Sequence, residues 1–194
     1  MKIQHSTIEH LGEYAKHLKN LNEHDRYTRF GYAAGPAAID QMILNMLYNP
    51  AQHHVFTYRT DDRIVGFGHL AQEGAEWELA VSVDTDYQGQ GVANELMDYM
   101  IAWGKTHGVH VVYMHCITEN QKIQHLARKH GLKTFERSGH ELSAHVELPP
   151  PTVFDYTANF VREQSELAKD IVKLQRTWLK NLNPALTLNK QDTK

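Results

Sequence analysis

The sequence contains a single cysteine, Cys116, among its 194 residues. A chain with one cysteine forms no internal disulfide, which is typical of proteins of a reducing compartment. It has no apolar run approaching the roughly 20 residues that a membrane span requires. Its first residues also lack the apolar segment of a signal peptide. We therefore expect a cytoplasmic protein that does not associate with membranes.

Charge of neither sign is in large excess: 20 lysines and arginines stand against 23 acidic residues, a net charge of −3 with neutral histidines. This balance gives no support to nucleic-acid binding as the main function, because such proteins usually carry a basic patch. With 41% hydrophobic residues, the chain can bury a core without disulfides or metal. We expect one domain, or one domain with an appendage.

Histidine, in contrast, is abundant, with 14 copies. The copies are scattered, and they form neither a His-Glu-x-x-His motif nor a Cys/His quartet at zinc-binding spacing. His53 and His54 are adjacent, so on a strand their side chains point to opposite faces. We expect no metal site, and we expect the net charge to rise noticeably below about pH 6.5.

Hydrophobic periodicity predicts a mixed α/β order with two helices between the first two strands. Strands are expected at residues 2–6, 54–59, 63–70, 77–83, 111–118, 132–138 and 141–148. Helices are expected from near Ile8 (capped by Ser6 or Thr7), from Pro36 to about Asn49, and over residues 92–107 and 120–130. Residues 21–35 are polar and rich in arginine. This order predicts an α+β fold with a largely antiparallel sheet flanked by helices.

Three consecutive prolines at 149–151 mark a change in composition. They divide the chain into a domain at 1–148, a linker at 149–153, an amphipathic helix at 154–182 and a polar tail at 183–194. The apolar stripe of the helix contains Phe160, Leu167, Ile171, Leu174, Trp178 and Leu182. Such a stripe requires a cover, which is either a second copy of the chain, giving a homodimer, or the chain's own domain.

Residues 77–107 read as a strand, a glycine-rich turn and a helix, and the turn is Gln88-Gly89-Gln90-Gly91-Val92-Ala93. Glycines at this spacing let a ligand approach the backbone, and the positive end of the following helix favours a phosphate. A P-loop requires Lys-Ser/Thr where Val92-Ala93 stand, and a dinucleotide fingerprint requires a small residue where Asn94 stands. A turn without a ligand stays open as an alternative.

Gln88, Gly91 and Ala93 match the Gln/Arg-x-x-Gly-x-Gly/Ala motif of the GCN5-related N-acetyltransferases (GNAT), and residues 78–87 resemble the strand that precedes it. Thr118-Glu119-Asn120, followed by Gly131-Leu132, is similar to the second motif of that family. The segment 21–30 is similar to one in bacterial protein-lysine acetyltransferases. Residues 1–148 therefore resemble a GNAT domain.

This resemblance implies acetyl-CoA as co-substrate and no metal. Backbone N–H groups of the glycine-rich turn would hold the pyrophosphate, and the edge of the preceding strand would bind the pantetheine amides. The CoA-binding residues implied in this way are Val81, Val83, Gln88, Gly89, Gln90, Gly91, Val92, Ala93 and Asn120. The pantetheine would enter where the fourth and fifth strands separate.

Acetyl transfer to an amine requires a base, because a lysine-like amine with a pKa near 10.4 is almost fully protonated at neutral pH. Glu78 stands at the position that often carries the general base in the family, and Glu76 is the reserve. Alternation places Glu76, Glu78, Ala80 and Ser82 on one face of the strand, opposite Leu79, Val81 and Val83. A solvent-exposed edge carboxylate is the alternative interpretation of Glu78.

The general acid departs from the family pattern, because Ala127 stands where many members have a tyrosine that protonates the CoA thiolate. Water can serve instead, since a thiol pKa lies near 8.5. Tyr99 and Tyr113 are candidates only if the fold turns them inward. Cys116 is interpreted as a core residue, because no His-Asp/Asn pair accompanies it.

We predict an acetyl-CoA-dependent N-acetyltransferase that acts by direct transfer in a ternary complex. Its acceptor is a protein lysine, a peptide N-terminus or a small amine. Two other functions stay open, a non-catalytic acyl-CoA-binding regulatory module and a nucleotide- or dinucleotide-binding protein.

Overall fold

The computed structural model describes residues 3–6, 8–60, 63–162, 164 and 172. The chain forms two compact units, residues 1–152 and 153–194, and each is described by itself. In the second unit, residues 153–162 are helical, and most of the expected helix at 154–182 lies outside the described residues. No helix in the described part of the chain is long and apolar enough to cross a bilayer.

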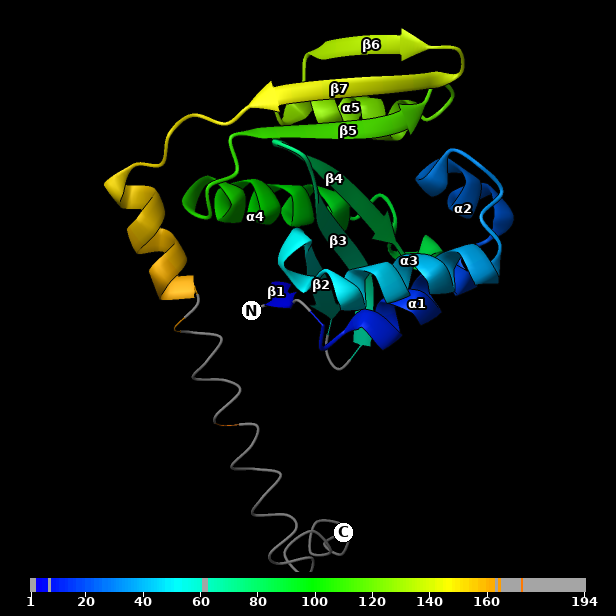
Figure 1. Ribbon diagram of the computed structural model, residues 1–194, viewed down its shortest axis with the longest axis horizontal. Coiled ribbons are helices and arrows are strands. Elements are labelled where there is room, and N and C mark those ends of the chain that lie inside the picture. The colour runs from blue at the N-terminus through cyan, green and yellow to red at the C-terminus, as the bar shows by residue number, and fades with distance from the viewer. Residues whose placement is uncertain (1–2, 7, 61–62, 163, 165–171, 173–194) are drawn as a thin grey trace, which may run out of the picture. The chain divides into compact units, whose positions relative to one another are not determined.

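The first unit contains one seven-stranded sheet in the order β1-β2-β3-β4-β5-β7-β6 (Figure 1). All neighbouring strands are antiparallel except β4 and β5, which are parallel. The strands are β1 (Ile3–Ser6), β2 (His53–Thr60), β3 (Arg63–Glu73), β4 (Glu76–Val83), β5 (Val111–Ile117), β6 (Thr134–Ser138) and β7 (Glu141–Glu147). The predicted α+β fold with a largely antiparallel sheet is therefore confirmed.

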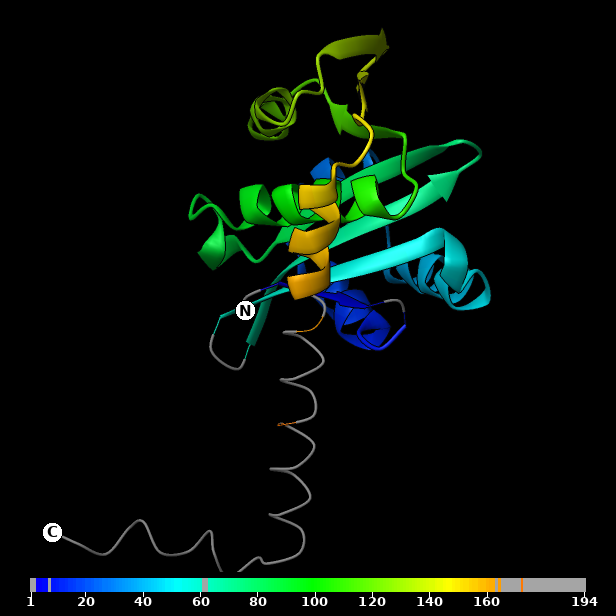
Figure 2. The same cartoon turned by 90° about the vertical axis from the view of Figure 1, so that its left-hand side faces the viewer.

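Helices cover both faces of the sheet (Figure 2). They are α1 (Leu11–Asn20), α2 (Glu23–Phe30), α3 (Pro36–Tyr48), α4 (Val92–Thr106) and α5 (Gln121–Lys129). A main hydrophobic core joins α4 and α5 to one face, and a second core joins α1 and α3 to the other. Leu79, Val81 and Val83 of β4 belong to the main core, whereas Ser82 contacts α1 on the opposite face.

Two expectations for the N-terminal region were wrong. Helix α1 begins at Leu11 and not near Ile8, Ser6 belongs to β1, and the capping position is His10, without a side-chain hydrogen bond. The polar segment 21–35 contains a further helix, α2, so three helices and not two separate β1 from β2. No residue of α2 is buried, which explains why the segment lacks an apolar period.

The parallel pair β4–β5 is short, and this positions the site. The two strands pair only at Trp77 with Val112 and at Glu78 with Tyr113. The rest of β4 pairs with β3 alone among the described strands. The edge of β4 beyond Glu78 is therefore exposed to the space between the strands, as a splayed pair requires.

Candidate functional site

A cavity of about 840 Å³ opens where β4 and β5 separate. Its walls come from residues 79–83 of β4, Met114 and His115 of β5, the turn and first residues of α4, the start of α5, and several residues of α2. A volume of this size suits a large ligand in an elongated site. The glycine-rich turn, the edge of β4 and Asn120 thus line one cavity, although they are distant in the sequence.

The glycine-rich turn presents backbone at one end of this cavity. Gly89 and Gly91 have φ angles of +75° and +87°, which favour glycine, and a Cβ built on either meets no atom within 4 Å. The N–H of Glu95 donates to the Gly91 carbonyl at 3.0 Å, so the hydrogen bonds of α4 begin there. The N–H groups that precede Glu95 lie at the positive end of the helix, where an anion is stabilised.

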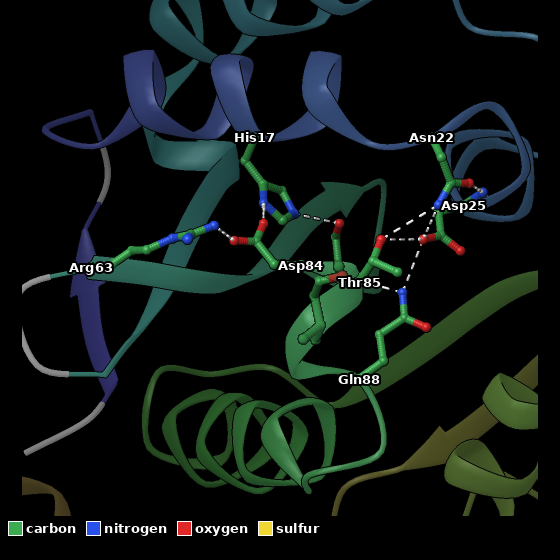
Figure 3. Close-up of polar contacts among 9 residues, drawn as sticks. His17, Asn22, Asp25, Arg63, Asp84, Thr85 and Gln88 are labelled. Atoms are coloured by element: carbon green, nitrogen blue, oxygen red, sulfur yellow. Dashed lines mark hydrogen bonds and ion pairs between the residues drawn. The ribbon is translucent and has the colours of Figure 1, made fainter.

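The side chain of Gln88 points away from this cradle and toward α2 (Figure 3). Its Nε2 donates to Asp25 Oδ2 at 3.0 Å and to the Val83 carbonyl at 3.4 Å. The same Asp25 oxygen accepts hydrogen bonds from Thr85 Oγ1 and Asn22 Nδ2, at 3.1 and 2.8 Å. Gln88 therefore ties the turn to α2, a role that the motif did not reveal.

We expect Asp25→Ala to weaken CoA binding by about tenfold, the equivalent of roughly one charge-assisted hydrogen bond. The variant removes the acceptor that holds both Gln88 and Thr85. Isothermal titration with CoA measures the change. Asp40→Ala, at an exposed carboxylate of α3 that pairs with Lys19, is the control. Equal affinity in wild type and Asp25→Ala would contradict this role.

The other predicted CoA-binding residues line the same cavity, with the exception of Gln90. The side chains of Val81 and Val83 are buried in the main core, which leaves their backbone to face a ligand. Asn120 is the capping residue of α5, and its side chain accepts the N–H of Ile123 at 3.2 Å. Gln90 turns its side chain back to the Asp86 carbonyl at 2.9 Å.

The two candidate bases, Glu78 and Glu76, do not line the cavity, whereas Arg29 does. Glu78 is half-buried beside its strand partner Tyr113, next to the β4 residues that line the cavity. Arg29 of α2 lines the cavity; burial acts to lower its pKa, but Tyr14 and Glu78 raise it overall. Glu76, the reserve base, lies 3.6 Å from His145 Nδ1. A positive and a negative group thus lie close together at this wall.

A second polar cluster joins α1 to the end of β4 (Figure 3). His17 Nε2 lies 2.7 Å from Ser82 Oγ, and His17 Nδ1 lies 2.9 Å from Asp84 Oδ1. Arg63 Nη2 donates to the other oxygen of Asp84 at 2.6 Å. Burial lowers the pKa of His17, partly offset by Asp84. The net effect favours the neutral form of the ring.

The sequence did not reveal this cluster, because His17 and Ser82 are 65 residues apart and follow no motif. The alternation of side chains along β4 predicted only that Ser82 points to the same side of the sheet as Glu78. The packing of α1 against the sheet was needed to find its partner.

Comparison with known proteins agrees with this geometry. Residues 16–132 match the model of the Acetyltransferase (GNAT) family. The chain belongs to the GNAT acetyltransferase family. No curated protein matches the sequence.

Solved GNAT structures share the fold at low sequence identity. The GNAT domain of S. lividans PAT is 16% identical, with 75% of this chain and 89% of that chain covered and a TM-score of 0.65. Spermidine N-acetyltransferase from Vibrio cholerae, in complex with CoA and spermine, is 15% identical, with 76% and 96% covered and a TM-score of 0.57. The ribosomal-protein-S18-alanine N-acetyltransferase from Escherichia coli is 15% identical, with 78% and 97% covered and a TM-score of 0.57.

Neither of the two candidate acids, Tyr99 and Tyr113, lines the cavity of this GNAT domain, and neither do Ala127 and Cys116. Ala127 is buried in the main core, and Tyr99 packs against Phe56 in the same core. Tyr113 donates to Glu73 at 2.6 Å, and burial together with this hydrogen bond raises the pKa of Tyr113. Burial also raises the pKa of Cys116, which disfavours a nucleophilic thiolate.

Proposed function

We propose that this protein transfers the acetyl group of acetyl-CoA directly to an amine in a ternary complex. The observation that carries the proposal is the open cradle of backbone N–H groups at Gly89 and Gly91, in one cavity with the exposed edge of β4. The cradle suits a pyrophosphate, and the strand edge suits the two amides of pantetheine. The CoA complex of the spermidine acetyltransferase supports this assignment by likeness.

The acceptor amine enters as an ammonium ion, so it loses two protons during acetylation. One is released to solvent, and the other ends on the sulfur of CoA. We propose that Glu78 removes the first proton, either directly or through a water molecule. Glu78 is half-buried and does not itself line the cavity, but it precedes Leu79, which does, and water can bridge its carboxylate to the amine.

We propose a protein lysine as the acceptor, with a small amine as the second candidate. The first is supported by the similarity of segment 21–30 to protein-lysine acetyltransferases and by the fold match to the PAT domain. The structure places most of that segment in α2, which lines the cavity with Asp25, Thr28 and Arg29. The second is supported by the fold match to the spermidine acetyltransferase.

The test is turnover with acetyl-CoA across a panel of lysine peptides and small amines. We expect Glu78→Gln to lower kcat/KM by about 100-fold, the lower end of what general base catalysis contributes, while CoA affinity is unchanged. Glu147→Gln, at the exposed end of β7, is the matched control. Full activity of Glu78→Gln would exclude Glu78 as the base.

The alternative is a non-catalytic acyl-CoA-binding module, and it is favoured by the buried Ala127 in place of the usual tyrosine. Tight binding of acetyl-CoA without acetylation of any acceptor would support it. Thermal shift with CoA, NAD and ATP separates both functions from nucleotide binding, because a bound ligand raises the melting temperature.

We also propose a homodimer through the C-terminal helix. In its described part, Val153, Phe154, Phe160 and Val161 are exposed apolar side chains. Their exposure supports a second copy as the cover. Light scattering of the full chain tests the oligomeric state.

A further inference from the structure

A chain of hydrogen bonds leads from the cavity wall to the protein surface. Ser82 lines the cavity and contacts His17 at 2.7 Å. His17 contacts Asp84 at 2.9 Å, and Asp84 accepts from the exposed side chain of Arg63 at 2.6 Å. His17 itself is buried and does not line the cavity, whereas its partner Ser82 does.

The partners of His17 fix the position of its proton. The carboxylate of Asp84 is an acceptor, so Nδ1 of the neutral ring carries the hydrogen, and Nε2 accepts the hydroxyl hydrogen of Ser82. Charged groups on three elements bear on the ring: Asp84 after β4 raises its pKa, Arg29 of α2 lowers it, and Arg63 of β3 pairs with Asp84. Phe67 packs against the ring at 4.9 Å between centroids.

The trio has the arrangement of a hydroxyl activated by a histidine that a carboxylate orients. In acetyl transfer such a group has a defined task, which the proposed function leaves open. After the amine attacks, its nitrogen still holds a proton that must reach the sulfur of CoA. Ala127 cannot supply the acid, and the tyrosines described above do not line the cavity.

We propose that Ser82 and His17 carry this second proton from the attacking nitrogen to the sulfur of CoA. The nitrogen lone pair forms the N–C bond, and its proton passes to Ser82 Oγ as the hydroxyl proton of Ser82 passes to His17 Nε2. The C–S bond then breaks, and its electron pair leaves with the sulfur. The proton returns from His17 through Ser82 to the thiolate, which yields the amide and CoA thiol.

Asp84 is a positioning residue in this scheme. It holds the tautomer that leaves Nε2 free to accept, and it stabilises the imidazolium ion that forms transiently. Glu78 keeps its separate task, the removal of the first proton. Glu78 and Ser82 lie on the same face of β4 but about 13 Å apart along the strand. Glu78 therefore acts on the entering ammonium ion through water, whereas Ser82 meets the attacking nitrogen directly.

This inference rests on the proposed function, so wild-type turnover and CoA affinity are measured first. We expect Ser82→Ala to lower kcat by about 100-fold, in the range of general acid–base catalysis, with CoA affinity within twofold. Ser6→Ala is the matched control, because it also removes a buried serine hydroxyl, one without a hydrogen-bond partner at the sheet edge. We expect Ser82→Thr, which keeps a hydroxyl, to stay within tenfold of wild type.

The solvent isotope effect separates proton transfer from a structural role. We expect wild-type kcat to fall at least twofold in D2O, and we expect this effect to disappear in Ser82→Ala. If Ser82→Ala does not fold, Asp84→Asn is tested instead, and we expect the same loss of kcat and of the isotope effect. Unchanged kcat in folded Ser82→Ala or Asp84→Asn, or an acetylated Ser82 found by mass spectrometry, overturns the relay. Absence of wild-type turnover with intact CoA binding would instead refute the proposed function.

Discussion

Replacing Gly91 with alanine is expected to raise the dissociation constant of CoA by about 100-fold, the equivalent of roughly 2.7 kcal/mol. Gly91 has a φ of +87°, where an alanine costs about 1–2 kcal/mol. The new methyl group would also enter the open space of the cradle, where no protein atom lies within 4 Å. The strain lowers the stability of the free and bound protein alike, so the obstruction by the methyl group is what weakens CoA binding. Isothermal titration of CoA against both proteins measures the effect.

Gly108→Ala is the matched control for the strain alone. Gly108 follows α4 at its other end with a φ of +78°, and a Cβ there also meets no atom within 4 Å. We expect this variant to lose stability but to bind CoA like the wild type. Equal affinities of Gly91→Ala and Gly108→Ala would show that the turn does not hold the ligand.

Acidification from pH 7 to pH 5 is expected to lower the free energy of unfolding by about 2 kcal/mol through two histidines. His5 and His54 contact each other at 3.2 Å and pack on Trp103, with ring centroids 4.8 and 4.5 Å away. Burial and neighbouring histidines lower the pKa of each to about 4. The expected loss of about 2 kcal/mol is about half of what these two pKa shifts would give for fully buried rings, because both rings keep partial contact with water.

The direction follows from the unfolded chain, in which both histidines titrate near pH 6.5. Above that pH both states are neutral, and the contribution is fully present. As the pH falls from 6.5 toward 4, the unfolded state takes up protons that the folded state excludes, and stability is lost. Urea unfolding at pH 7, 6 and 5, followed by tryptophan fluorescence, measures this loss.

His54→Gln is expected to reduce the loss by about 1 kcal/mol, because it removes one of the two linked groups. Other histidines whose pKa burial lowers, such as His69 and His17, keep their own contribution to the remaining loss. His140→Gln, at a side chain that is 85% exposed, is expected to leave it unchanged. A pH dependence that is the same in wild type and His54→Gln would exclude the cluster as its cause.

Local patterns in the sequence were sufficient to predict the fold. The alternation in β4 and the 3.6-residue period in α4 are strong, because each element has one buried face. The glycines of the turn and the motif around Asn120 pointed to the GNAT family, which the family match confirmed. The individual CoA-binding and catalytic residues stay predictions.

The sequence was less informative where stability comes from polar contacts. Helix α2 has no buried residue, and only its capping residue Asn22 and the left-handed Gly31 marked its ends. The partner of Gln88 was not predictable for the same reason, since Asp25 lies on that helix. His17 and Ser82 meet only through the tertiary packing of α1, which no local pattern records.

The short pairing between β4 and β5 has a consequence for the stiffness of the sheet when CoA binds. Strands β1–β4 form one part of the sheet, and β5, β7 and β6 form the other. Among the described residues, Trp77 and Glu78 are the positions of β4 that pair with β5. A pantetheine bound along β4 would add backbone-like rungs where the ladder stops. The CoA-bound protein would then be stiffer between β4 and β5 than the free protein. Release of CoA would break the hydrogen bonds between pantetheine and β4. In this sense the co-substrate would extend the sheet like a temporary eighth strand.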